Sequence, residues 1–420
     1  MIDTLMDTEA SKRIVIYGAV AHVPPPERLP RRVRTYIKHA VLTWSDILRW
    51  RLLRKLDQLD YRSYVTPSVV NIGDVAIIKA SCQTLSKAMG LFKFQFKFQY
   101  SNWEDRSNFY INENLKDESI IAVCGSGYIT FDRDGRLAGR LRGDLNAMQS
   151  TEADVVFYGI GVNRLLTAGG VGAPVITDVD AEILRQLLHR AALISVRDFN
   201  SQKILSRYTD KPIRLISDPA FYLAEIDHKR DKNHLISNTG QVVIGINFPF
   251  HGPDATARVR ESLPSYIAML KKIQHQTKCK FVYMLHFEAA RIIPRLLKNS
   301  GVSMDIIGGS PDTLIEGYRS LNIHIGGMLH SCILAASAGT PSVAIAYDVK
   351  HAGFFSLLGL ERYCIPATPF DADRFVTAAL SALAEEDELR ATIRSARVRL
   401  EKEADAFAAD CVKLMNKPKV

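Results

Sequence analysis

The sequence lacks the long hydrophobic run that a membrane-spanning helix needs, because none of its apolar stretches reaches about 18 residues. Its six cysteines are scattered without CxxC spacing, which argues against a zinc site or a disulfide framework and predicts reduced, mostly buried thiols. The first residues, MIDTLMDTEASKR, are too polar and acidic for a signal peptide. We therefore expect a cytoplasmic protein without a bound metal.

The chain is too long for a single hydrophobic core. At 420 residues, with 47% hydrophobic and 24% charged residues, it has the composition of a soluble globular protein of two domains. The sequence predicts an N-terminal domain over residues 1–225, a polar linker over 226–241 and a C-terminal domain over 242–370. Residues 371–420 are expected to form helices that pack across the domain junction.

Nearly all of the net positive charge of the chain lies in one segment. Residues 28–56 contain nine Lys or Arg and a single acid, Asp46, so they carry +8 of the net charge of +9. Apolar residues recur there at helical spacing, which predicts a basic amphipathic helix within an insertion at about 28–60. Such a helix either lies peripherally on an anionic membrane surface or docks on its own domain, and the sequence leaves both open. No nucleic-acid recognition motif accompanies the charge, so we expect no nucleic-acid partner.

Short apolar runs alternate with helical patterns along most of the chain, which predicts parallel sheets covered by helices on both faces. The expected strands of the first domain are Ile14–Tyr17, Phe92–Tyr100, Ile120–Cys124, Val155–Tyr158, Leu193–Val196 and Ile213–Ile216. Those of the second domain are Val242–Asn247, Phe281–Leu285, Asn322–Ile325 and Ser342–Tyr347.

Polar clusters follow several of these strands. Each one alone is typical of a turn or a helix cap, and Asp74 in particular is expected to cap the helix Val75–Met89. Together they would lie at the carboxyl edge of one sheet, where open α/β folds bind ligands. The clusters are Asn71-Ile72-Gly73-Asp74, Gly125-Ser126-Gly127, Gly159-Ile160-Gly161, Arg197-Asp198 with Ser201, and Asp218-Pro219-Ala220.

A histidine in the second half has the same kind of position. His330 follows the strand Asn322–Ile325 and the turn Gly326-Gly327, and it precedes the helix Ser331–Ala338. Backbone N–H groups and the dipole at a helix N-terminus favour an anion, so a negatively charged substrate is expected there. Lys350 follows the next strand and adds a cation.

The order of these motifs, continued by Leu329-His330-Ser331 and Tyr347-Asp348-Val349-Lys350, resembles that of the polysaccharide pyruvyl transferase family over about residues 66–360. The resemblance implies an α/β fold of two Rossmann-like, doubly wound parallel-sheet domains in a GT-B-like arrangement, with the active site between them. It implies transfer of the pyruvyl group of phosphoenolpyruvate to two hydroxyls of a sugar, without a further cofactor. The acceptor would be a sugar or lipid-linked oligosaccharide of an exopolysaccharide or envelope glycan.

The chemistry of ketal formation needs a proton donor, a base for the attacking hydroxyl and cations for the leaving phosphate. We assign His330 as general acid or phosphate contact, Arg197 as the partner of a donor oxygen and Asp74 as the hydroxyl base. Arg197 would then face His330 across the domain junction. The expected substrate-binding residues are Asn71, Gly73, Gly125, Ser126, Gly127, Gly159, Gly161, Ser331 and Lys350.

One departure from the family and one shared fold keep alternatives open. Many family members carry an arginine two residues before the histidine, and this chain has Met328 there, which removes a likely cation for the donor. A GT-B glycosyltransferase or nucleotide-sugar epimerase would share the fold, but the helix Ser331–Ala338 lacks the acid expected to hold a nucleotide ribose. The sequence Asp178-Val179-Asp180 is expected to cap a helix rather than to bind a metal. A non-catalytic glycan-binding or assembly protein is the third reading.

Overall fold

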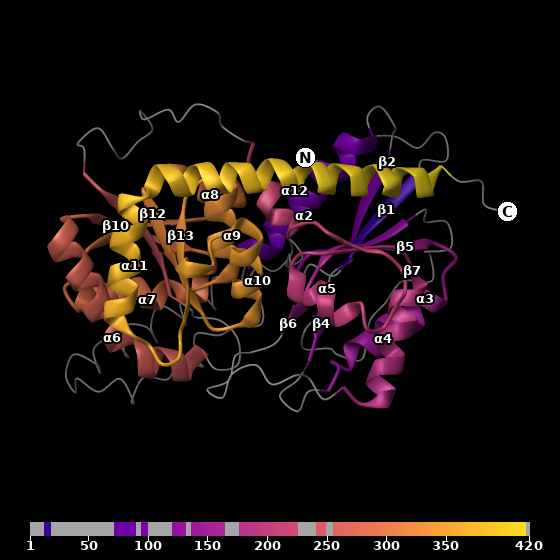
Figure 1. Ribbon diagram of the computed structural model, residues 1–420, viewed down its shortest axis with the longest axis horizontal. Coiled ribbons are helices and arrows are strands. Elements are labelled where there is room, and N and C mark those ends of the chain that lie inside the picture. Colours follow the sequence, from indigo (N-terminus) through magenta and orange to yellow (C-terminus); the bar gives the residue numbers. More distant parts are fainter. Residues whose placement is uncertain are drawn as a thin grey trace, which may run out of the picture.

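The computed structural model describes residues 12–17, 71–89, 94–99, 120–131, 136–163, 176–225, 241–248 and 255–416. The basic segment 28–56 and nearly all of the expected linker 226–241 lie outside these ranges. Two α/β halves stand side by side, and one long helix runs along both of them (Figure 1). The predicted fold class is confirmed, because each half contains a parallel sheet with helices on both faces.

The first sheet has six parallel strands in the order β2-β1-β3-β5-β7-β8. The strand positions expected from the apolar runs agree with those observed to within a few residues. They are β1 (Lys12–Tyr17), β2 (Phe94–Gln99), β3 (Ile120–Cys124), β5 (Asp154–Ile160), β7 (Ala191–Val196) and β8 (Ile213–Leu215). The short strands β4 (Ile129–Thr130) and β6 (Val162–Asn163) pair separately. The helices are α2 (Ile72–Met89), α3 (Arg140–Gln149), α4 (Asp178–Arg190), α5 (Phe199–Leu205) and the 3-10 helix η4 (Pro219–Tyr222).

The second sheet has six parallel strands in the order β11-β10-β9-β12-β13-β14, the strand order of a Rossmann fold. Its strands are β9 (Val243–Asn247), β10 (Lys280–Leu285), β11 (Met304–Gly308), β12 (Ile323–Gly326), β13 (Ser342–Ala346) and β14 (Cys364–Pro366). The helices are α6 (Ala255–Thr277), α7 (Ile292–Asn299), α8 (Pro311–Arg319), α9 (Leu329–Ser337), α10 (Val349–Leu358), α11 (Ala372–Ala384) and α12 (Glu386–Met415), with η5 (Glu288–Arg291) and η6 (Glu361–Tyr363).

Two expected helix caps are wrong, and in both helices a neighbouring residue caps instead. Asn71 accepts a hydrogen bond from Gly73 N (3.0 Å), so α2 starts earlier than expected and Asp74 lies inside its first turn. In α4 the cap is Thr177, while Asp178 lies in the first turn. An acid in the first turn is favoured by the helix dipole and leaves its carboxylate available for other contacts.

The two halves share one apolar core. Side chains of β3 and β5 alternate in direction, so one face of the first sheet packs on α3 and α4, while the other face joins the core of the second half through α2, η4 and α12. The rings of Tyr158 on β5 and Phe407 on α12 have centroids 5.7 Å apart. Phe221 of η4 meets Phe354 of α10 at 5.8 Å.

Helix α12 joins the halves physically. Figure 1 shows it in yellow, lying along one side of both sheets. At its start Arg390 donates to three backbone carbonyls of the second half, including Leu321 O at 2.7 Å. Near its end Asp410 accepts from Arg214 of β8 at 2.8 Å, and Asp405 pairs with Lys87 of α2 at 2.8 Å. The polar contacts of α12 with the second half are therefore buried, whereas its charge pairs with the first half lie nearer the surface.

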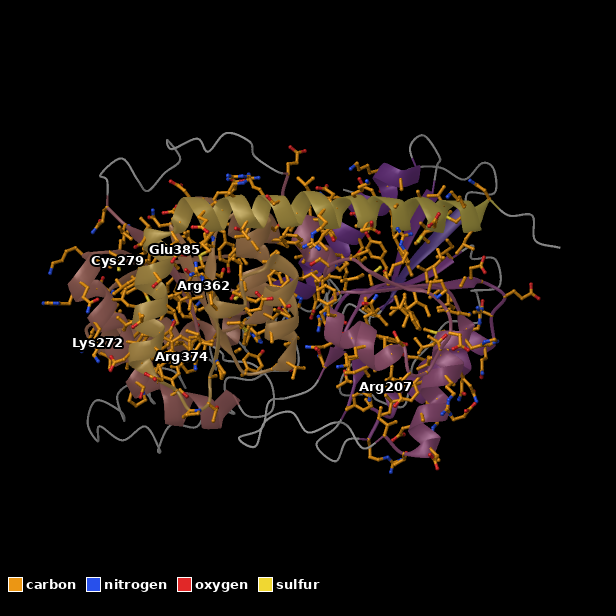
Figure 2. The ribbon with its side chains drawn as sticks, viewed as in Figure 1. Arg207, Lys272, Cys279, Arg362, Arg374 and Glu385 are labelled. Carbon is orange, nitrogen blue, oxygen red and sulfur yellow. The ribbon has the colours of Figure 1, made fainter. Side chains whose placement is uncertain are left out.

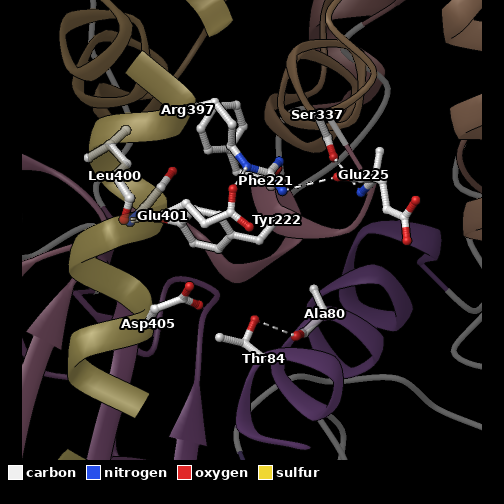
Figure 3. A network of polar contacts seen from close by, with 12 residues as sticks. Ala80, Thr84, Phe221, Tyr222, Glu225, Ser337, Arg397, Leu400, Glu401 and Asp405 are labelled. Carbon is white, nitrogen blue, oxygen red and sulfur yellow. Dashed lines mark hydrogen bonds and ion pairs between the residues drawn. The ribbon is translucent and has the colours of Figure 1, made fainter. Parts of the chain in front are cut away.

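The middle of α12 holds η4 at the junction, as the close view in Figure 3 shows. Arg397, 4% exposed, donates to the carbonyls of Phe221 and Ala224, the latter at 3.0 Å. Its guanidinium carbon lies 5.2 Å from the centroid of the Phe221 ring and 5.0 Å from that of Tyr222. The N–H of Ala224 donates to Ser337 Oγ at the end of α9 (3.0 Å), so η4 is tied to both halves.

The corner between α11 and α12 is fixed by charge. Glu385 accepts a hydrogen bond from Tyr363 and forms an ion pair with Arg362, both from η6. Figure 2 shows Arg362 and Glu385 on the second half, on the side away from the first.

Within the described ranges, no helix is both long and apolar enough to cross a membrane. All six cysteines are free and four of them are buried, as the sequence predicts.

Candidate functional site

His330 is held at the strand order reversal of the second sheet. Strands β9 and β12 are neighbours there, and the last residue of β9, Asn247, binds the turn that follows β12. Gly327 N donates to Asn247 O at 2.8 Å, and Met328 N donates to its side-chain oxygen at 3.1 Å. Helix α9 starts directly after this turn, two residues earlier than expected, so His330 lies inside its first turn and not before it.

Ser331, a predicted substrate ligand, faces the interior of the second half. It is fully buried, and its hydroxyl donates to Met328 O at 2.7 Å. Since that bond uses the only hydroxyl hydrogen, His324 Nε2, 3.0 Å away, must be the donor to Ser331 Oγ. Burial lowers the pKa of His324 to about 3, in agreement with a neutral imidazole. Ser331 and His324 therefore fix the first turn of α9 from behind.

The N-terminus of α2 is seated on the second half. Ile72 N donates to the carbonyl of His286 at the end of β10 (3.1 Å), a bond between distant parts of the chain. Gly73 then packs so closely on the His330 imidazole that a Cβ at this position would overlap the ring. Glycine is thus required by close approach, and the next residue, Asp74, is brought beside His330.

Arg197 is anchored in the first half. It follows β7, and its guanidinium Nη2 donates to Asn163 Oδ1 at 2.9 Å, while Nη1 donates to Asp218 Oδ2 at 3.3 Å. The salt bridge to the adjacent Asp198 is longer, with Nε 3.7 Å from Oδ2. Asp198 mainly caps α5 by accepting from Ser201 N at 2.7 Å.

The two halves meet at Asp218. His330 Nε2 lies 3.8 Å from Asp218 Oδ2, the same oxygen that accepts from Arg197, although it is beyond hydrogen-bond distance. The side chains of Asp218, Arg197 and His330 are 1%, 4% and 14% exposed. Within the described part of the chain, neither Arg197 Nε nor His330 Nε2 has a hydrogen-bond partner. Arg197 and His330 therefore converge on one carboxylate oxygen from different halves.

Burial and neighbouring charges move two carboxyl groups of this cluster in opposite directions. Burial, and then the charge of Asp218, raise the pKa of Asp74 from 3.8 to about 6, although His330 and Lys350 oppose the shift. Burial would also raise the pKa of Asp218, but His330 and Arg197 outweigh it and hold that pKa below its ordinary value. Carboxyl groups separated in this way are typical of sites that need one group to exchange a proton and another to stay ionised.

Lys350 is the more exposed of the two fixed cations of the site. Its ammonium lies 3.6 Å from Asp348 Oδ2 and 5.5 Å from the centroid of the Tyr347 ring, and the side chain is 16% exposed. Asp348 is also the cap of α10, accepting from Lys350 N at 3.1 Å. The lysine can therefore reach an incoming anion more readily than Arg197.

The predicted glycine clusters build the support beneath Arg197. Gly125 and Ser126 have φ of +52° and +58°, and Gly159 has +63°, within an irregular part of β5. Ser126 O accepts from Gly161 N at 2.9 Å, which joins the loops after β3 and β5. A Cβ on Gly161 would overlap the guanidinium of Arg197, and one on Gly127 would overlap Asn163. These contacts are made with protein groups, so any contact of the glycines with substrate stays a prediction.

Three residues of the cluster were missing from the predicted site. Asp218 was recognised only as part of a turn, although it caps η4 by accepting from Ala220 N at 3.1 Å and joins the two halves. Asn163 and His351 were not singled out. Their positions in the sequence could have indicated them, because Asn163 closely follows Gly161 and His351 directly follows Lys350. In the described ranges no three His, Cys, Asp or Glu side chains form a metal-binding group.

Comparison with known proteins identifies the family of the chain. The family model described as polysaccharide pyruvyl transferase matches residues 71–349, which include every predicted site residue except Lys350. No curated protein is significantly similar in sequence. A putative UDP-N-acetylglucosamine 2-epimerase from Listeria monocytogenes has a similar fold, with a TM-score of 0.50, 11% identity and coverage of 81% of this chain and 91% of that one.

A second solved structure gives a weaker match. The S. aureus MnaA–UDP co-structure has a TM-score of 0.48 and 11% identity over 76% of this chain and 88% of that one. At such identities the likeness concerns the fold alone, which is the GT-B fold.

Proposed function

The chain belongs to the polysaccharide pyruvyl transferase family, and we propose that it moves the pyruvyl group of phosphoenolpyruvate onto two hydroxyls of a sugar to form a pyruvate ketal. The family is one of transferases. The observation that best supports the proposal is the meeting of Arg197 and His330, from different halves, at one oxygen of Asp218. A donor with carboxylate and phosphate groups needs cations and a proton donor in this proximity.

The reaction divides into two additions at C2 of the donor. One sugar hydroxyl bonds to C2 while a proton adds to the methylene carbon, which becomes the methyl group. The bond between C2 and the phosphate oxygen then breaks, and the second hydroxyl bonds to C2. Two hydroxyl protons are lost in total, and they balance one proton on carbon and one on the released phosphate.

The described side chains can be assigned to these steps. Asp74, with its pKa raised to about 6, is ionised at neutral pH and basic enough to accept a hydroxyl proton. His330 delivers the proton to the methylene carbon, with the ionised Asp218 balancing the charge of its protonated form. Arg197 and Lys350 bind the carboxylate and the phosphate.

Because Met328 stands in place of the arginine common in the family, other residues must neutralise the negative charge of the donor. Met328 is 3% exposed, and its backbone N–H serves the turn before α9. A thioether offers no positive charge, so the phosphate must rely on Lys350, the N-terminus of α9 and the anchored Arg197. We expect Lys350 to contribute more to donor binding in the wild type than it would in a Met328→Arg variant.

We also propose a cytoplasmic reaction on a lipid-linked oligosaccharide for an exopolysaccharide or envelope glycan. The sugar acceptor is supported by the family, and the lipid carrier by the composition of residues 28–56. A segment with +8 charge and an apolar stripe would bring the enzyme to an anionic membrane surface, where such acceptors lie. Binding to vesicles with and without anionic lipid, for the full chain and a variant with five arginines of this segment replaced by glutamine, tests this part separately.

The transfer itself is tested by incubating the enzyme with phosphoenolpyruvate and a panel of p-nitrophenyl hexosides. We expect phosphate release and a glycoside heavier by one pyruvate less one water. His330→Asn should reduce transfer by about a hundredfold or more, the usual value of a general acid. His189→Asn, on the exposed face of α4, is the matched control.

A second pair of variants tests the guanidinium. Arg197→Lys keeps the charge but loses the two-pronged contact with Asn163 and Asp218, so transfer should fall strongly. Arg207→Lys, at an exposed position after α5 (Figure 2), should not change it. Release of nucleotide from a UDP-sugar, with none of phosphate from phosphoenolpyruvate, would replace the proposal by a glycosyltransferase. Full activity of His330→Asn would remove the role given to the imidazole.

A further inference from the structure

A second histidine beside the site has a ring nitrogen with a lone pair and no partner among the residues that the structure describes. His351, in the first turn of α10, is 0% exposed, and its Nδ1 lies 3.2 Å from the main-chain carbonyl of Asp348. A carbonyl can only accept, so Nδ1 must carry the hydrogen of this bond. In the neutral ring Nε2 then holds a lone pair, and among the described residues it has no hydrogen-bond partner.

The ring of His351 is neutral because of its surroundings. Burial lowers its pKa to about 3, and the nearby positive charges of Lys350, Arg197 and His330 act in the same direction. Neutral imidazole with hydrogen on Nδ1 is therefore the form present at physiological pH.

The position of His351 is fixed by packing. Gly353, in the same helix, lies against the side chain of Asp198 so tightly that a Cβ would come within 2.8 Å of the Asp198 Cβ. The imidazole meets the Tyr347 ring edge to face, with centroids 5.0 Å apart. Helix α10 thus packs on Asp198, the neighbour of Arg197, and carries His351 in the turn before this contact.

A buried nitrogen without a partner costs stability, and a hydrogen bond donated by a bound ligand would remove this cost. An ionised carboxylate or phosphate oxygen would be repelled by the lone pair of Nε2. A hydroxyl group can donate to it. Ketal formation uses two hydroxyls of one sugar, and Asp74 can accept the hydrogen of only one of them at a time.

We propose that Nε2 of His351 accepts a hydrogen bond from one hydroxyl of the sugar acceptor and so positions the hydroxyl pair over C2 of the donor. The inference rests on the proposed pyruvyl transfer and names the acceptor subsite within it. His351 is a positioning residue and takes up no proton. Protons of the two hydroxyls go to Asp74 and the leaving phosphate, while His351 determines which pair of hydroxyls fits.

Two substitutions separate the two nitrogens of the ring. In His351→Asn the amide N–H stands near the position of Nδ1 and can keep the bond to Asp348 O, but nothing replaces Nε2. In His351→Gln the longer side chain places an amide oxygen near the position of Nε2. With the best p-nitrophenyl hexoside as probe, His351→Asn should raise the KM for the glycoside by about 3- to 10-fold, the usual value of one uncharged hydrogen bond.

The KM for phosphoenolpyruvate should remain unchanged in both variants, and His351→Gln should recover most of the loss. His189→Asn serves as the surface control. An equal rise in the KM for phosphoenolpyruvate would place His351 on the donor and overturn the inference. A His351→Gln enzyme as impaired as His351→Asn would also overturn the inference, because the loss of a purely structural ring would affect both variants equally.

A spectroscopic measurement keeps the test independent of turnover. In full-length enzyme with ¹⁵N-labelled imidazoles, the Nε2 resonance of His351, assigned with the variants among the 11 histidines, should be that of an unprotonated nitrogen. It should shift when the glycoside is added. If no glycoside is pyruvylated but this shift occurs, the proposed transfer fails and the sugar subsite stands. If transfer occurs without a shift, the inference about His351 is wrong and the transferase remains.

Discussion

Replacing Asp74 by asparagine should stabilise the protein at neutral pH and lose this effect in acid. The pKa of the Asp74 carboxyl rises from 3.8 to about 6 on folding, mainly through burial. The folded chain therefore holds this proton more tightly than the unfolded chain, so wild-type stability falls as the pH rises from about 4 to about 6. A shift of about two units corresponds to about 3 kcal/mol at pH 7. Asp74 is half-buried as a residue, which makes this an upper limit.

The assay compares urea unfolding of the wild type and Asp74→Asn at several pH values between 4 and 7.5. The variant should gain up to about 3 kcal/mol at pH 7 and almost nothing near pH 4, because asparagine does not titrate. Asp178→Asn is the control, since Asp178 is exposed in the first turn of α4 and should cost less than about 1 kcal/mol. A gap between wild type and Asp74→Asn that is equal at all pH values would refute the reasoning.

The same variant should be inactive over the whole range, because its amide cannot accept a hydroxyl proton. A more stable and inactive enzyme is the combination expected when a catalytic group is kept in unfavourable surroundings. Transfer that persists in Asp74→Asn, measured by phosphate release, would assign the base to another residue.

Two further substitutions test how the site is built. Gly73→Ala, whose methyl group would displace the adjacent imidazole, should lower kcat at least about tenfold with little change in Tm, whereas Gly139→Ala has open space and should be neutral in both assays. Arg397→Met, which leaves buried carbonyls without their donor, should cost about 2–4 kcal/mol in urea unfolding, whereas exposed Arg394→Met should cost almost nothing. A destabilisation equal in both arginine variants, or a fully active Gly73→Ala, would contradict these expectations.

Most strands could be predicted from the sequence because they are buried runs. Ile120–Cys124 is buried at every position and was placed without error. Strand Met304–Gly308 was missed, since it is an edge strand with exposed positions and an aspartate, which weakens its apolar signal. The cap of α2 was misplaced because Asn71 and Asp74 both suit a cap. The choice between them is made by a bond from Ile72 N to a residue more than 200 positions away.

The residues of the candidate site could likewise be predicted only in part. The elements that present Arg197 and His330 follow from local pattern, so these residues could be proposed from the sequence. The role of Asp218 depends on its contacts with Arg197 and His330, which lie 21 and 112 positions away in the sequence. No local sequence pattern contains that information. His351 differs again, since its importance lies in a nitrogen without a partner in the described part of the chain, and hydrogen-bond satisfaction can be assessed only in the folded chain.

The 3-10 helix η4 explains why a residue as distant as Arg397 should influence catalysis. Asp218 caps η4 at one end, and Phe221 and Ala224 at the other end give their carbonyls to Arg397. Asp218 is thus separated from the two carbonyls bound by Arg397 by only three and six residues of a buried segment. A shift of η4 moves the oxygen on which Arg197 and His330 converge. Arg397→Met should therefore lower kcat as well as stability, although its side chain contacts neither substrate nor catalytic residue.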